Sequence, residues 1–200
     1  MARSFAVSWD YRCPFARNAH EHLVAGLQAG ADWDVTFLPF SLGQVHVKEG
    51  ELDVWDDETK LPGLVALAAG VAVRDDQPDR FLDAHLGLFR ARHVDGRDIR
   101  EWDVLADVLA KAGADVEAVK ERLDDGSAVH QLRKEHEAAV ADVRMWGVPT
   151  FVAGGRGVFV RFMHRPEGDT KVAIDTIERT VDLVAGWLDL NEFKQTFVPR

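Results

Sequence analysis

The stretch that decides the fold is FAVSWDYRCPFARNAH, which runs from Phe5 to His20. Its first part is a short, alternating apolar run, which is the pattern of a β-strand. Helix formers follow Cys13, and Pro14 suits the first turn of a helix, where a missing N–H costs nothing. The pattern therefore predicts a strand and then a helix to about residue 29, with Cys13 at the N-terminus of that helix.

Cys13 is the only cysteine of the chain. A lone cysteine is more often a small buried apolar residue, but a Cys-Pro pair between a strand and a helix is a poor arrangement for inert packing. The free N–H groups and the helix dipole at a helix N-terminus favour a thiolate over a thiol. Arg12 and Arg17 would add positive potential nearby. We therefore predict that Cys13 is a reactive thiol held as the thiolate.

The composition excludes several classes of function. The chain has 200 residues and a net charge of −10, and its Lys and Arg form no basic stripe, so nucleic acid is not expected as a partner. The longest apolar stretch, Leu64 to Val73, is too short to span a membrane, and no membrane partner is expected. A single cysteine forms no intrachain disulfide, and the first residues lack a signal segment, so we expect a cytoplasmic protein.

Apolar periodicity predicts the remaining elements. A second strand is expected over residues 33–42, parallel to the first because the two flank a helix, and residues 43–59 read as a loop. Helical patterns continue to about residue 145. Strand patterns return at residues 148–152 and 158–162 as a hairpin, and a last helix covers residues 174–188.

The histidines do not indicate a metal site. There are eight, and none has the spacing of a zinc ligand set, so we read them as solvated or core residues and assign no role to His20. The glycine-rich segment 154–157 lies between two strands, whereas a phosphate cradle needs a helix start, so it reads as a turn.

In the order of its elements the whole chain resembles the DsbA family of thioredoxin-fold oxidoreductases. The resemblance rests on Cys13-Pro14 at a helix start and on WGVPTF, from Trp146 to Phe151, ahead of a hairpin and a last helix. More narrowly, WDYRCPFA from Trp9 to Ala16 is similar to the cytosolic FrnE-like branch. The resemblance implies an α/β fold with a thioredoxin-like β-α-β…β-β-α core in residues 1–59 and 146–200. Residues 60–145 would form a large all-helical insertion domain.

The resemblance also implies a site. Cys13 would be the nucleophile and the Val148–Pro149 peptide bond would be cis and face it. Val148, Pro149 and Thr150 would orient the backbone of an extended substrate. Further residues expected to shape the site or contact the substrate are Asp10, Tyr11, Arg12, Pro14 and Phe15.

One departure from the family concerns its Cys-x-x-Cys motif, because Ala16 occupies the second cysteine position. Ala16 cannot resolve a mixed disulfide, so an external low-molecular-weight thiol, such as glutathione or mycothiol, must do so. We therefore predict a monothiol thiol–disulfide oxidoreductase or isomerase that acts on a disulfide-containing substrate and holds no tightly bound cofactor.

Two alternatives stay open. The glutathione transferase kappa and 2-hydroxychromene-2-carboxylate isomerase branch has Ser-Pro-Tyr where Cys13-Pro14-Phe15 stand. The resemblance to that branch implies a thiol-cofactor-dependent transferase or isomerase for a small electrophilic substrate. The third reading is a non-catalytic binding module. The sequence also leaves open whether the protein forms a homodimer.

Overall fold

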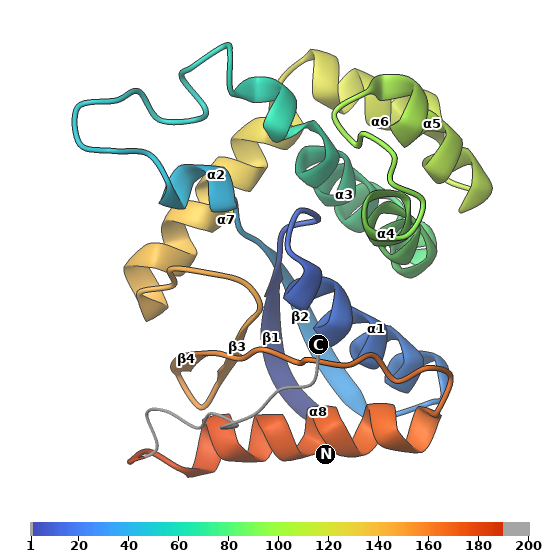
Figure 1. The fold of residues 1–200 in the computed structure, drawn as a ribbon, viewed down its shortest axis with the longest axis vertical. Helices are drawn as coiled ribbons and strands as arrows, with labels where there is room; N and C mark the ends of the chain where they lie inside the picture. Colours follow the sequence, from blue (N-terminus) through green and yellow to red (C-terminus); the bar gives the residue numbers. More distant parts are fainter. Residues whose placement is uncertain (1, 190–200) are drawn as a thin grey trace.

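A four-stranded sheet in the order β2-β1-β3-β4 carries the N-terminal and C-terminal parts of the chain (Figure 1). The computed structural model describes residues 2–189. β1 (Arg3–Trp9) and β2 (Trp33–Pro39) pair in parallel, as predicted for strands that flank a helix. β3 (Thr150–Ala153) lies antiparallel to β1, and β4 (Arg156–Phe159) pairs with β3 as a hairpin.

Two helices pack together against this sheet, α1 (Pro14–Gln28) and α8 (Thr170–Gly186). Leu23 of α1 and Ile177 of α8 are fully buried against Phe151 of β3. Asp169 caps α8 by accepting a hydrogen bond from the N–H of Val172 at 3.0 Å. This layer fixes α1, and with it Cys13, at the carboxyl end of β1.

Every regular element between β2 and β3 is helical, and most of these helices stack above the far end of the sheet (Figure 1). Trp9 of β1 and Phe37 of β2 meet Phe81 there, with ring centroids 5.9 and 5.0 Å apart. The fold is therefore α/β, with a β-α-β…β-β-α core and a large helical insertion, as predicted. The helices of the insertion are α3 (Val65–Asp76), α4 (Pro78–His93), α5 (Trp102–Lys111), α6 (Val116–Asp124) and α7 (Ser127–Val143).

Several predicted boundaries are wrong. β2 ends at Pro39 rather than residue 42, and the short helix α2 (Leu42–Val45) takes up the start of the expected loop. A 3-10 turn, Leu61–Gly63, follows the loop. Ser41 begins α2 because its hydroxyl accepts from the N–H of Gln44 at 3.3 Å. β4 covers Arg156–Phe159, not residues 158–162, and α8 ends at Gly186. Residues 190–200, which we assigned to the thioredoxin-like domain, lie outside the described residues. Within residues 2–189, no helix has the length and apolarity needed to cross a membrane.

Candidate functional site

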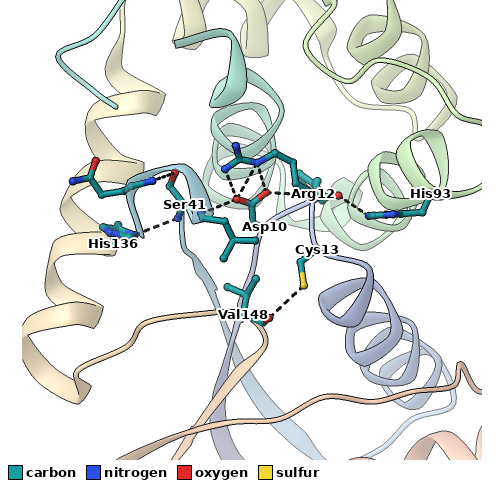
Figure 2. A network of polar contacts seen from close by, with 10 residues as sticks. Asp10, Arg12, Cys13, Ser41, His93, His136 and Val148 are labelled. Atoms are coloured by element: carbon teal, nitrogen blue, oxygen red, sulfur yellow. Dashed lines mark hydrogen bonds and ion pairs between the residues drawn. The ribbon is translucent and has the colours of Figure 1, made fainter. Parts of the chain in front are cut away.

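Cys13 is the N-cap residue of α1, directly after the turn that follows β1. Its Sγ accepts from the backbone N–H of Ala16 at 3.4 Å. The thiol lies 3.3 Å from the carbonyl oxygen of Val148, to which its S–H donates (Figure 2). The structure thus brings the Cys-Pro helix and the segment before β3 together, although Cys13 is only 8% exposed.

The pKa of the Cys13 thiol is raised, not lowered. Burial is the largest cause, because removing the sulfur from water penalises the charged thiolate. The N–H groups of Ala16 and Phe15 act in the opposite direction, as expected at a helix N-terminus. The prediction of a resting thiolate is therefore wrong, since the loss of hydration outweighs the helix terminus.

Arg12 does not face the sulfur either. Its guanidinium pairs with Asp10, with Nη2 at 2.7 Å from Oδ2, and Figure 2 shows Arg12 and Cys13 pointing to opposite sides of the loop. Arg17 pairs with Glu21 one turn further along α1, at 2.7 Å. Neither arginine supplies the positive potential that the sequence led us to expect.

Arg161 is the cation that lowers the pKa of Cys13, and sequence reasoning missed it. It follows β4, and its guanidinium lies over the rings of Phe15 and Phe159, at 5.2 and 5.3 Å from their centroids. The only sequence signal was the alternation around β4, which does not show which strand residue faces the cysteine. Phe15 thus carries the guanidinium of Arg161, and its role toward a substrate stays a prediction.

The Val148–Pro149 peptide bond is cis. Thr150 is buried next to it, and its N–H donates to the hydroxyl of Ser8 at 2.8 Å. Its own hydroxyl donates to the carbonyl of Gly147 at 2.7 Å. Thr150 therefore holds the Pro149 turn in place, and its polar groups are not left for a substrate. The N–H of Val148, by contrast, has no acceptor among the described residues.

Asp10 and Tyr11 are both buried. The carboxylate of Asp10 accepts from the backbone N–H groups of Arg12 and Leu42, at 2.9 Å each, besides the guanidinium. The Tyr11 hydroxyl bonds to Nδ1 of His85 at 2.9 Å, and burial raises its pKa. The polar groups of both residues are satisfied inside the protein, so the structure supports a positioning role and not the predicted substrate contact.

A buried chain of hydrogen bonds continues from Tyr11 to β1. His85 bonds to Nδ1 of His20 at 2.9 Å, and Nε2 of His20 bonds to the carbonyl of Ser8 at 3.1 Å. Because a carbonyl can only accept, His20 must carry its proton on Nε2 and accept at Nδ1 from Nε2–H of His85. Nδ1 of His85 is then an acceptor, to which the Tyr11 hydroxyl donates. Burial lowers the pKa of His20 to about 4 and holds that of His85 well below its usual 6.5, so both are neutral. His20, which had no predicted role, thus supports the loop that carries Cys13.

The surface beside the sulfur is aromatic. Trp146 is 61% exposed and its ring centroid lies 4.5 Å from that of Phe159. Pro14 is exposed in the first turn of α1. Trp9 and Phe40 are not part of this surface, because both are fully buried in the core. A substrate would therefore meet an apolar rim around a nearly covered thiol.

A parallel β-α-β unit, a hairpin and a cysteine opposite a cis-proline define a thioredoxin-fold protein. The chain belongs to the DSBA-like thioredoxin domain family, whose model matches residues 6–165. A comparison with curated proteins finds no match.

Solved structures share the fold at low sequence identity. 2-Hydroxychromene-2-carboxylate isomerase is 14% identical with a TM-score of 0.63, and the match covers 90% of this chain and 96% of that one. MdbA, a thiol-disulfide oxidoreductase from Actinomyces oris, is 19% identical with a TM-score of 0.61, over 87% and 80%. DsbA from Pseudomonas aeruginosa is 21% identical with a TM-score of 0.55, over 90% and 84%.

Proposed function

We propose that the protein is a monothiol thiol–disulfide oxidoreductase or isomerase of the cytoplasm. Cys13 is the nucleophile, and an external low-molecular-weight thiol, such as glutathione or mycothiol, resolves the mixed disulfide. The observation that carries the proposal is the 3.3 Å contact between Sγ of Cys13 and the carbonyl of Val148, next to Pro149. The N–H of Val148 has no acceptor within residues 2–189, and its carbonyl accepts only from the Cys13 thiol. An extended substrate that displaces this thiol contact would pair with both groups, as at a strand edge.

The same contact explains how a buried thiol becomes reactive. A substrate N–H that donates to the Val148 carbonyl competes with the S–H of Cys13 for that acceptor. The N–H groups of Ala16 and Phe15 and the charge of Arg161, which lower the pKa of the thiol, then remain around Sγ, while burial and the charge of Asp10 still raise it. Because the S–H loses its acceptor, substrate binding shifts Cys13 toward the thiolate relative to the empty site.

The reaction proceeds by two exchanges. The Cys13 thiolate attacks one sulfur of a substrate disulfide, forms a mixed disulfide with it and releases the other sulfur as a thiolate, which takes up a proton. Ala16 has no thiol to attack this mixed disulfide. The external thiolate therefore attacks the substrate sulfur, restores the Cys13 thiolate and leaves as a mixed disulfide with the substrate. The external thiol is the reductant.

A thiol-dependent transferase or isomerase is the second candidate. One observation in its favour is Ala16, because a reaction that forms no mixed disulfide needs no second cysteine. The other is the similarity in fold to 2-hydroxychromene-2-carboxylate isomerase, which covers 96% of that chain. In that mechanism the external thiol, not Cys13, would form the bond to the substrate, and the Cys13 S–H would only hold the thiol cofactor in place.

The test is the reduction of bis(2-hydroxyethyl) disulfide by glutathione or mycothiol, with wild type and Cys13→Ser side by side. The proposal predicts turnover that requires the external thiol and is abolished by Cys13→Ser. Conjugation of glutathione to 1-chloro-2,4-dinitrobenzene is measured on both proteins as well. If the wild-type protein does not reduce the disulfide, and both wild type and Cys13→Ser conjugate glutathione, the protein is a transferase instead.

A further inference from the structure

A cavity of about 490 Å³ opens beside residues 10–12, on the insertion side of the loop. Most of its lining comes from this loop, from residues 59–67 and from residues 98–100 after α4, and Gly43, Val54 and Arg92 complete it. Its volume is in the range of small-molecule sites. Among the described residues that line it, neither Cys13 nor Val148 is present, so it is separate from the thiol site.

The lining of this cavity combines an apolar wall with positive charge. Leu64, Leu67 and Ile99 are buried in the wall. Two carboxylates, Asp10 and Asp98, line the cavity together with four cationic side chains, which are Arg12, Lys60, Arg92 and Arg100. The lining therefore carries a charge of 4 − 2 = +2, in a protein whose net charge is −10.

Two Asp-x-Arg pairs present their guanidiniums to the cavity in the same way. Asp10 accepts from the backbone N–H, Nε and Nη2 of Arg12, at 2.9, 3.1 and 2.7 Å. Asp98 accepts from the same three groups of Arg100, at 3.0, 2.9 and 2.6 Å. Each guanidinium is thereby fixed, while its Nη1 has no acceptor within residues 2–189. Gly63 keeps the space beside Arg12 open, since a Cβ there would lie 3.6 Å from Nη1.

Arg92, in the last turn of α4, adds a third guanidinium. It pairs with no carboxylate in the part of the chain that the structure describes. The bonds from Arg100, and after them the charge of Arg92, lower the pKa of Asp98 to about 2. Asp98 thus stays ionised as the partner of Arg100; it also attracts Arg92, but the two form no ion pair within residues 2–189.

We propose that this cavity binds a small organic anion with an apolar body. Its carboxylate or sulfonate is held by Arg92 and by the Nη1 groups of the two Asp-x-Arg pairs. Fixed guanidiniums suit such groups because their donors are already oriented. The apolar body lies against the wall of Leu64, Leu67 and Ile99. The proposal does not rest on the reaction of Cys13, because the sulfur does not line the cavity.

The test uses the fluorescent anion 1-anilinonaphthalene-8-sulfonate and its neutral analogue N-phenyl-1-naphthylamine, titrated into the full chain carrying Cys13→Ser. Arg92→Ala and Arg100→Ala should each weaken binding of the anion about fivefold or more, as expected for a lost charge-assisted hydrogen bond. The matched control is Arg90→Ala, which removes an exposed arginine of the same helix that pairs with Asp95 and does not line the cavity. It should change the affinity less than twofold.

The neutral analogue should bind the Arg92→Ala protein as it binds the parent. Equal weakening of both probes, an equal effect of Arg90→Ala, or an affinity unchanged by both cavity variants would overturn the proposal. Loss of anion binding in Trp146→Ala would do so as well, because it would place the probe on the aromatic surface. Melting temperatures confirm that each variant is folded, and Arg92→Gln replaces Arg92→Ala if that variant is not.

Discussion

Gly70→Ala should disrupt the support of the Cys13 loop from a distance. Gly70 lies in α3, and a Cβ added there would overlap the hydroxyl oxygen of Tyr11 and lie 3.0 Å from Cε2 of its ring. The ring cannot retreat easily, because it is fully buried and its hydroxyl bonds to His85 at 2.9 Å. We expect Tyr11 to move and this hydrogen bond to break.

The cost follows from three contributions. Overpacking a core costs about 1–3 kcal/mol, and an unpaired buried nitrogen on His85 costs about 1–3 kcal/mol. Alanine offsets about 1 kcal/mol through its better helix propensity. The sum is a destabilisation of about 3 kcal/mol, which corresponds to a fall in Tm of about 6–12 °C for a chain of this size.

A double-mutant cycle with Tyr11→Phe makes this reasoning refutable, because phenylalanine lacks the atom with which the new methyl group collides. Unfolding in urea gives the free energies, and the rate of Cys13 alkylation by iodoacetamide reports on the loop. The double variant should be at least about 1 kcal/mol more stable than the sum of the two single changes predicts. Gly186→Ala, where an added Cβ meets nothing within 4 Å, is the control. Additive effects within about 0.5 kcal/mol would refute the collision.

Three further predictions concern the charge, the histidine chain and the proline turn. Arg161→Gln should raise the pKa of Cys13, because it removes a charge that favours the thiolate; alkylation rates against pH measure this, and an unchanged pKa contradicts it. The pKa of His20 is lowered from 6.5 to about 4, so its contribution to stability is fully present above pH 6.5 and is lost as the pH falls toward 4. This amounts to about 3 kcal/mol, and a His20→Gln variant whose urea stability falls as steeply over that range would count against it. Ser8→Ala should cost about 1–2 kcal/mol in urea unfolding, because the N–H of Thr150 loses its acceptor; no loss of stability would mean that water replaces the hydroxyl.

The fold was predictable because local patterns and topology rules agree. Alternation before Asp10 and helix formers after Cys13 are enough to place β1 and α1, and the helical crossover to β2 then predicts the parallel pairing. Boundaries were less predictable where a side chain decides them. The chain turns from β2 into α2 at Ser41, whose hydroxyl caps the helix. The sequence shows a Ser within an apolar run but not that its side chain caps a helix there.

The electrostatics of the site were not predictable in the same way. The sequence shows that Arg12 precedes Cys13 but not that Asp10 binds the guanidinium on the other side of the loop. It also does not show how deeply the sulfur is buried, and that burial sets the direction of its pKa shift. Arg161 is distant in sequence, and only the packing of its guanidinium on Phe15 brings it to the site.

The most direct test of Cys13 as a nucleophile resolved from outside is the intact mass of the protein after incubation with glutathione disulfide. The account predicts one glutathione adduct per chain, absent from Cys13→Ser and removed by added glutathione with recovery of the free thiol. A wild-type protein that forms no adduct at any pH at which it is folded, or an adduct that external thiol does not remove, would contradict it.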